Sequence, residues 1–482
     1  MSNLAKEPAM ARINALLDEN SFVEIGGLVT ARNTDFNMQE KAVASDGVIT
    51  GYGLIDNCLV YVYSQDASVL GGTVGEMHAK KIAGIYDMAV KMGAPVAALV
   101  DCAGLRLCEA EDALNAFGEI YAKQAMASGV VPQITGVFGT CGGGMGILAS
   151  LSDFTFMAED GKLFVNAPNT LDKNRTEKCD TASAKYQAET AGMADFTGTE
   201  EEVLAGMRQL ISLLPLNNND YAEGSCSDDL NRICENLENC AGDTSIALAN
   251  IADSGMFFEA GKQYARDMVT GFLKLNGITI GAVANRTTCY DEEMNVTDEF
   301  KNVLTTAGCE KAAKFVTFCD AFNIPVLTLT NTSGFAATVE EEKGIARAAA
   351  KLTYAYANAV VPKVNLIVGD AMGNAYNVMN SKACHADLVY AWPTAKIGAM
   401  NADSAVRIIY AEELKKAEDS AAFLAQKKAE YEALQISAAS AARRGYVDSI
   451  VEPEDTRKYI IGAFEMLYTK KEERLTKKHG TV

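Results

Sequence analysis

The chain has 482 residues, more than a single hydrophobic core usually holds (about 250–300 residues), so we expect at least two domains. The composition, 49% hydrophobic and 22% charged, is typical of a soluble globular protein. The net charge of −20 argues against a nucleic acid or an acidic membrane surface as partner, while a local basic patch could still bind an anionic substrate.

The cysteines and the N-terminal residues indicate a reducing compartment. Twelve cysteines are scattered without a C-x-x-C pair, so nothing points to a zinc ribbon, another metal site or a redox pair. We expect reduced thiols, as in cytosolic proteins. The first ten residues, MSNLAKEPAM, contain no apolar run of the signal-peptide kind, and no run in the chain reaches membrane-spanning length. We therefore expect a cytoplasmic protein.

The first half of the chain predicts strands that alternate with helices. A β-hairpin begins near Thr50, and apolar residues at helical spacing predict a helix over 75–92. The runs APVAALV (94–100) and PQITGVF (132–138) are almost wholly apolar, as expected for strands of a sheet that is covered on both faces. This order of elements predicts an α/β domain.

The second half repeats this order at an offset of 230 residues. GAPVAALVDCAG (93–104) matches NIPVLTLTNTSG (323–334), and the register continues through Gly143 and Gly373 without a gap. An upstream hairpin has the turn Asn276-Gly277, which is a strong hairpin signal. We predict two α/β domains of one fold, residues 1–240 and 241–482, joined through the polar segment 215–244.

The C-terminal region predicts one further helix. Lysines and glutamates alternate at helical spacing over roughly 404–432, which indicates a helix that faces solvent or flanks a dimer contact.

The glycine-rich stretch ITGVFGTCGGGMGIL (134–148) needs a specific explanation. A P-loop would require Lys and Ser/Thr after its last glycine, and a dinucleotide fingerprint would require glycine at Ile147, so both phosphate-binding motifs fail on spacing. A strand that ends in glycines and opens into a helix can instead aim backbone N–H groups at a developing negative oxygen. Gly143 and Gly144 would supply one such oxyanion hole, and Gly373 and Asn374 a second. The alternative is that these glycines only allow tight strand–helix packing.

Candidate side-chain bases are scarce. The three histidines are His78 within the predicted helix, His385 beside Cys384, and His479 in the tail, and none lies in a convincing Ser-His-Asp order. Two interpretations remain open for Arg106, Lys80 and Lys81: they contact phosphates, or they face solvent.

With these features in place, the chain resembles the carboxyltransferase subunits of biotin-dependent acyl-CoA carboxylases and the related acyl-CoA decarboxylases. The resemblance runs from about residue 11 to 470. It is carried by the segments ARINALLDENSFVEI, GVITGYGLID, GGTVGEMHAKKI, ASGVVPQITGVFGTCGGGMG, FCDAFNIPVLTLTNTSGF, VPKVNLIVGDAMGNAYNVM and YAWPTAKIG.

The resemblance implies tandem crotonase-type (β-β-α spiral) domains, with the acyl-CoA in the N-terminal domain and carboxybiotin in the C-terminal domain of a dimer partner. It also implies that the ureido group, and no side chain, takes the α-proton. By family position, the acyl-CoA would contact Ala103, Gly104, Arg106, Gly143, Gly144 and Asn377. The biotin would contact Gly373, Asn374, Gly334 and Phe335.

The resemblance further implies partners. The A-M-K-M attachment motif is absent, so biotin would arrive on a separate carrier protein. A biotin carboxylase subunit would complete a carboxylase of propionyl-CoA or acetyl-CoA type, whereas a membrane subunit would complete a sodium-pumping decarboxylase of methylmalonyl-CoA or glutaconyl-CoA type. The expected assembly is a hexamer, a trimer of dimers.

Several positions depart from the family pattern. The second glycine pair is Gly373-Asn374, a usual Pro-Gly-Phe turn is Ser333-Gly334-Phe335, and the segments 165–200 and 286–309 differ from relatives. These departures leave the acyl group open and also leave room for a diverged, non-catalytic assembly scaffold.

Overall fold

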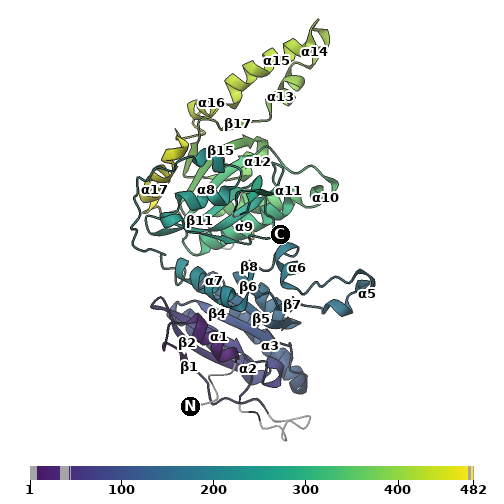
Figure 1. The fold of residues 1–482 in the computed structure, drawn as a ribbon, viewed down its shortest axis with the longest axis vertical. Coiled ribbons are helices and arrows are strands. Elements are labelled where there is room, and N and C mark those ends of the chain that lie inside the picture. Colours follow the sequence, from purple (N-terminus) through teal and green to yellow (C-terminus); the bar gives the residue numbers. More distant parts are fainter. Residues whose placement is uncertain (1–7, 33–42, 44, 292, 476–478, 481–482) are drawn as a thin grey trace. The chain divides into compact units, whose positions relative to one another are not determined.

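The computed structural model describes residues 8–32, 43, 45–291, 293–475 and 479–480. The chain forms two compact units, Met1–Ala222 and Glu223–Val482 (Figure 1). The prediction placed the division at 240, but residues 223–240 lie within the second unit: the N–H of Cys234 donates to the carbonyl of Glu454, and Leu237 packs in the same core as Leu248.

The first unit is built on one mixed sheet in the order β1-β2-β3-β4-β5-β6-β8, with β7 paired to β5. Strands β1 to β3 are antiparallel, and the remaining pairs are parallel. The strand bounds are β1 Val23–Glu24, β2 Val48–Ile55, β3 Cys58–Gln65, β4 Val96–Cys102, β5 Gln133–Gly142, β6 Phe154–Ala158, β7 Lys162–Phe164 and β8 Phe196–Gly198.

Helices cover both faces of this sheet. On one face α2 and α3 pack with the side chains of Tyr63, Val96 and Val137 in a buried core, whereas α1 and α7 contact each other and the opposite face. The near-continuous burial of β4 and β5 follows from this double cover, as predicted. The helix bounds are α1 Pro8–Leu16, α2 Glu76–Met92, α3 Ala110–Ala127, α4 Gly144–Ser150, α5 Asn174–Glu177, α6 Ala184–Glu189 and α7 Glu200–Leu213.

The second unit repeats this sheet. Its order is β18-β16-β15-β14-β11-β10-β9, with β17 paired to β15, and a separate ribbon pairs β12 with β13. The strand bounds are β9 Phe257–Ala260, β10 Met268–Leu275, β11 Ile278–Asn285, β12 Thr288–Tyr290, β13 Val296–Glu299, β14 Val326–Thr332, β15 Lys363–Met372, β16 Leu388–Ala391, β17 Lys396–Gly398 and β18 Ser449–Ile450.

Helices also cover both faces of the second sheet. The core on one face joins α8 and α17 to the central strands, and α9, which packs against α11, contacts β10 and β11. The helix bounds are α8 Thr244–Ile251, α9 Thr306–Ala321, α10 Val339–Glu342, α11 Ile345–Asn358, α12 Gly373–Val378, α13 Ala402–Ile409, α14 Ala411–Lys416, α15 Ser420–Tyr431, α16 Ala438–Arg443 and α17 Thr456–Leu467.

The predicted 230-residue register is present in the coordinates. Strand β15 begins and ends 230 residues after β5, and helix α9 begins 230 residues after α2. The hairpin turn Asn276-Gly277 joins β10 to β11 with φ values of 51° and 76°, the positive values that a primed two-residue turn requires.

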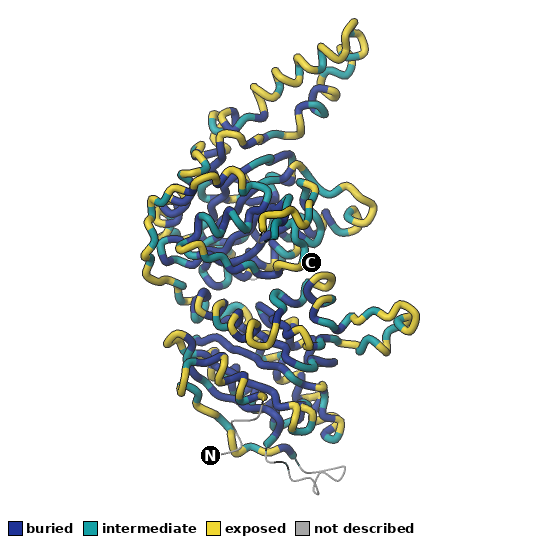
Figure 2. The backbone as a smooth tube through the Cα atoms, in the orientation of Figure 1, coloured by how far each residue is buried: buried dark blue, intermediate teal, exposed yellow. Residues whose placement is uncertain are grey.

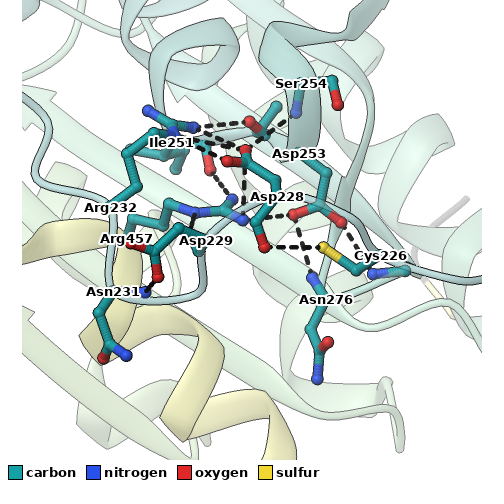
Figure 3. A network of polar contacts seen from close by, with 12 residues as sticks. Cys226, Asp228, Asp229, Asn231, Arg232, Ile251, Asp253, Ser254, Asn276 and Arg457 are labelled. Atoms are coloured by element: carbon teal, nitrogen blue, oxygen red, sulfur yellow. Dashed lines mark hydrogen bonds and ion pairs between the residues drawn. The ribbon is translucent and has the colours of Figure 1, made fainter.

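The segment that opens the second unit is held by a polar network around Arg457 (Figure 3). The buried Arg457 guanidinium donates to the carbonyls of Asp229 and Ile251 and to the Asp253 carboxylate, at 3.1, 2.6 and 2.6 Å. Asp253 in turn accepts from the N–H groups of the Asn276-Gly277 turn. The network thus ties α17, near the end of the chain, to the segment that enters the unit.

The C-terminal helix predicted over 404–432 is instead three helices, α13, α14 and α15, followed by a π-helical turn over Glu432–Ile436. The side chain of Asp419 accepts from the N–H groups of Ala421 and Ala422, so it caps a new helix start inside the predicted span. These helices are largely exposed and extend away from the second sheet (Figures 1 and 2).

No helix in the described part of the chain combines the length and apolarity that a bilayer crossing requires. All twelve cysteines are free thiols. Residues 1–7 of the N-terminal stretch MSNLAKEPAM lie outside the described residues.

Candidate active site: two glycine turns

The first glycine turn has a backbone that only glycine adopts readily. Gly143 follows β5 with φ 59° and ψ −121°, and no atom lies within 4 Å of the place where its Cβ would stand. In the described chain no backbone acceptor takes its N–H. Gly144 is the first residue of α4, where an N–H has no partner within the helix. The turn therefore presents unpaired main-chain donors beside open space.

Gly144 is a glycine for a different reason. A Cβ at this position would lie 2.8 Å from the Tyr121 hydroxyl and 2.9 Å from the Phe117 ring, both on α3. The Tyr121 hydroxyl also donates to the Gly144 carbonyl at 2.7 Å. Tight packing at Gly144 therefore occurs next to a partly exposed Gly143, beside whose backbone there is open space.

The loop after β4 lies against this turn. A Cβ on Gly104 would stand 3.3 Å from the Gly142 carbonyl oxygen, and a Cβ on Gly142 would stand 3.6 Å from the Ala103 carbonyl oxygen. The Gly104 carbonyl accepts from the N–H of Val74 at 2.9 Å, which fixes the loop. Ala103, Gly104, Gly143 and Gly144, placed together by family position, thus lie close together.

Arg106 does not face solvent. Its guanidinium is 2% exposed, pairs with Glu109 at 2.9 Å through Nη1 and donates to the carbonyls of Asp46 and Thr73 through Nη2. Lys81 is likewise buried and bonds Asp46 and the Val48 carbonyl, whereas Lys80 is half exposed and pairs with Glu76. Glu109 lies only three residues away, but Asp46 and Thr73 come from distant parts of the sequence, so the local sequence does not reveal this burial.

The second glycine turn repeats the positive φ of the first. Gly373 begins α12 with φ 59°, equal to the value at Gly143. Asn374 occupies the place of Gly144; its side chain is exposed, and its Oδ1 accepts from Asn377 Nδ2 at 3.4 Å. The preceding loop also repeats: Gly334 donates to and accepts from the Thr332 hydroxyl, as Gly104 does with the Cys102 thiol, and Phe335 pairs with Leu304 as Leu105 does with Val74.

A cavity of about 560 Å³ lies beside the second turn. Its walls combine the turn with the π-helical segment, α16 and the residues that follow. The lining residues are Gly373, Asn374, Tyr376, Asn377, Ile397, Gly398, Ala399, Gln435, Ala441, Arg444 and Tyr446. The family resemblance assigned Asn377 to the acyl side, and the structure places it in this cavity with Gly373 and Asn374.

The sequence analysis missed Gln435, Arg444 and Tyr446, because nothing in their spacing links them to Gly373. It also missed Ile147, which the 230-residue register does identify as the counterpart of Asn377. Ile147 is 44% exposed on α4, and Val165, 57% exposed, lies against the same helix, with its Cγ2 3.4 Å from the position of a Cβ on Gly146. The surroundings of the first turn are therefore apolar, and those of the second are polar.

The histidines His78 and His385 have different surroundings. His78 is fully buried, contacts Gln65 Nε2 and the Asp46 carbonyl at 3.1 and 3.0 Å, and loss of hydration together with the nearby Arg106 charge lowers its pKa to about 3. His385 is exposed in a turn after Cys384. Within the described ranges, no group of His, Cys, Asp and Glu side chains is arranged to hold a metal ion.

Comparison with known proteins places the chain in a family. The carboxyl transferase domain family matches residues 4–482. The chain is 40% identical to a methylmalonyl-CoA decarboxylase subunit alpha of Propionigenium modestum, covering 99% of this chain and 93% of that protein. It is 39% identical to a propionyl-CoA carboxylase beta chain of Roseobacter denitrificans, covering 99% and 94%.

The fold comparison agrees. The crystal structure of the transcarboxylase 12S hexamer with hydrolysed methylmalonyl-coenzyme A superposes with a TM-score of 0.91 at 34% identity, over 99% of this chain and 93% of that one. The predicted tandem crotonase-type fold and the predicted enzyme class, an acyl-CoA carboxyltransferase that is a component of a carboxylase or a decarboxylase, are confirmed. The chain belongs to the carboxyl transferase domain family.

Proposed function

We propose that this chain is the carboxyltransferase subunit of a biotin-dependent acyl-CoA carboxylase, with the acyl-CoA at the first glycine turn and biotin at the second. The observation that carries the proposal is the recurrence of one backbone turn, φ 59° at both Gly143 and Gly373, in two units with different surroundings. Two such turns suit a reaction with two carbonyl-containing reactants. A hydratase with a single substrate would have no use for the second.

The first turn suits the thioester. The N–H groups of Gly143 and Gly144 would donate to the thioester oxygen as it gains charge, with the Ala103-Gly104 loop beside it. Donors fixed in advance stabilise such an oxygen strongly, by about 10²–10³-fold in rate for a single donor. Exposed Ile147 and Val165 beside the turn suit a short apolar acyl group.

The second turn suits the ureido ring. Small-molecule sites usually have volumes of about 300–1,000 Å³, and the cavity at Gly373 falls within this range. Its amide and hydroxyl side chains, from Asn374, Asn377, Gln435 and Tyr446, match a polar ring. The N–H groups of Gly373 and Asn374 would donate to the ureido oxygen, and Gly334 and Phe335 would form the adjoining loop.

The reaction needs no ionisable side chain from the chain. Carboxybiotin held at the second turn would supply the carboxyl group: its N–C bond to the carboxyl would break, its ureido nitrogen would take the α-proton of the acyl-CoA, and a C–C bond would form at the α-carbon. Both turns then stabilise the negative oxygens on the two reactants. The pKa of His78, far below neutrality, supports this assignment, because a buried neutral imidazole that bonds only structural partners is not available as the base.

A short acyl-CoA of propionyl-CoA/methylmalonyl-CoA type is the proposed substrate, and the acetyl-CoA/malonyl-CoA pair is the alternative. The alpha subunit of a sodium-pumping decarboxylase is the second candidate function, because the relative from Propionigenium modestum is as similar as the carboxylase chain. Glutaconyl-CoA would be a further substrate of that class. Both functions would use the same two turns.

The proposed partners follow from the missing attachment motif. A separate biotin carboxyl carrier protein would enter the cavity, and a biotin carboxylase or a membrane decarboxylase subunit would complete the complex. We propose a hexamer in the cytoplasm, membrane-associated only if the partner is a membrane subunit.

The test is decarboxylation of methylmalonyl-CoA and of malonyl-CoA by the purified chain with free biotin as the acceptor. Biotin-dependent turnover with either substrate, together with CoA binding by calorimetry, is the expected result. If neither turnover nor CoA binding occurs, the chain is the diverged scaffold and the enzyme proposal fails. The neighbouring genes then separate the two candidate functions, since a biotin carboxylase gene favours the carboxylase.

A further inference from the structure

The cavity at the second turn contains a single charged side chain among its lining residues. Arg444 provides it, while the other polar groups in the wall are the amides of Asn374, Asn377 and Gln435 and the hydroxyls of Tyr376 and Tyr446. The chain as a whole carries a net charge of −20, so this cation is not part of a generally basic surface.

The Arg444 guanidinium is fixed by the wall that it lines. Nη1 donates to the Ser440 carbonyl at 3.0 Å and to the Ser440 hydroxyl. Nη2 donates to the Leu434 carbonyl at 3.3 Å and to Gln435 Oε1 at 3.1 Å. An arginine has five N–H donors, and these contacts occupy the two on each Nη. Within the described chain no acceptor takes the Nε–H.

All of these partners are neutral. Carbonyl, hydroxyl and amide oxygens hold the guanidinium in place without neutralising its charge, and none of its hydrogen bonds goes to a carboxylate. The cavity therefore combines a fixed positive charge and one remaining N–H with neutral hydrogen-bonding groups. Neutral groups bind a ureido ring with or without a carboxyl group, whereas a cation favours the carboxylated form.

We propose that Arg444 is the specificity-determining residue that distinguishes the carboxylated, anionic ureido ligand from the uncarboxylated one in this cavity. The inference rests on the proposed function, because it takes the cavity to be the biotin site. Arg444 acts through its charge and its Nε–H, while Gly373 and Asn374 bind the ureido oxygen of either form.

Three variants separate the effect of the Arg444 charge from the structural role of Arg444 in the cavity wall. Arg444→Gln removes the charge, Arg444→Lys keeps the charge without the planar fork, and Arg443→Gln removes an equal charge from the exposed neighbour, which does not line the cavity. Ligand-observed NMR at pH 8 then measures the binding of three probes: freshly prepared N1′-carboxybiotin, its neutral N1′-methoxycarbonyl analogue, and free biotin.

We expect the wild-type chain and Arg443→Gln to bind N1′-carboxybiotin about tenfold more tightly than the neutral analogue, the effect of one charge-assisted hydrogen bond. In Arg444→Gln this preference should disappear while the affinity for free biotin changes less than about twofold, and Arg444→Lys should retain part of it. Raising the salt concentration should weaken only the binding of N1′-carboxybiotin.

Two results would overturn the inference. If Arg444→Gln keeps the preference for the carboxylated probe, Arg444 does not read the carboxylate. If it loses affinity for all three probes equally, Arg444 only supports the wall. Failure of the proposed function is recognised separately, because the wild-type chain would then bind none of the probes and show no biotin-dependent turnover.

Discussion

The two glycine turns share a φ value and a preceding loop, and they differ in the side chains at and after the turn. Gly143 and Gly373 both have φ 59°, but the next residue is a glycine packed beneath Phe117 and Tyr121 in the first unit and an exposed asparagine in the second. The residue three positions further on is Ile147 in one and Asn377 in the other. The duplicated fold therefore preserves the turn, while the neighbouring side chains differ between the two units.

The strongest test of the shared backbone is Gly143→Pro beside Gly373→Pro. Proline fixes φ near −65° and removes the N–H at position 143 or 373, so each variant should lose at least about 10²-fold in kcat/KM while its oligomer persists by size-exclusion chromatography. Because proline could also disturb the strand, Gly143→Ala provides a second measurement: its Cβ enters open space, and only the positive φ is strained. Full activity in both Gly143 variants would remove that turn from the mechanism.

The next test addresses the residue that follows each turn. Gly144→Ala introduces a Cβ against Phe117 and Tyr121, and we expect urea unfolding to show a loss of about 1–3 kcal/mol. Asn374→Gly removes an exposed side chain but keeps the N–H, so stability should change by less than about 0.5 kcal/mol. Activity should fall only a few-fold in Asn374→Gly. Equal destabilisation in the two variants would show that the turns are packed alike.

The last test concerns Lys363 and its counterpart Gln133, which begin β15 and β5. Gln133 Nε2 donates to the Gln124 carbonyl at the end of α3, and Lys363 Nζ donates to the Tyr356 and Ala359 carbonyls at the end of α11. Burial lowers the pKa of Lys363 to about 8, below the 10.5 of an exposed lysine. Between these two pH values the unfolded chain binds more protons at Lys363 than the folded chain does. The contribution of Lys363 to the free energy of unfolding therefore rises from pH 8 to 10.5.

Lys363→Gln should therefore remove this rise and make the second unit resemble the first. Urea unfolding of wild-type and variant protein at pH 7.5, 9 and 10.5 measures it, and the ordinary titration of the other groups cancels in the difference. Parallel pH curves for the two proteins would mean that Lys363 titrates normally.

Much of the fold could be predicted from the sequence because the two halves corroborate each other. The apolar runs at 94–100 and 324–330 have the same length and the same glycine after them, which fixes strand, loop and turn at once. Local sequence patterns predicted the Asn276-Gly277 turn and the helix over 75–92, and the structure contains both. The turn residues Gly143, Gly144, Gly373 and Asn374 could be found in the same way.

The rest depends on contacts that no local pattern encodes. The environment of Arg106 is built by nearby Glu109 together with Asp46 and Thr73, which lie 60 and 33 residues away, so its burial could not be foreseen. The cavity wall at Gln435, Arg444 and Tyr446 comes from a segment more than sixty residues beyond Gly373. Of the two breaks within 404–432, the one before α15 coincides with a single capping aspartate, Asp419, inside an otherwise helical charge pattern.

The network around Arg457 has a consequence for how the protein is made. Arg457 lies near the end of the chain, and without it the carboxylates of Asp228 and Asp253 and the carbonyl of Ile251 would lose their common partner. The first unit is complete in sequence by residue 222 and can fold while translation continues. The contacts of Arg457 in the second unit can form only after α17 has left the ribosome, so a chain that ends before α17 would lack this network.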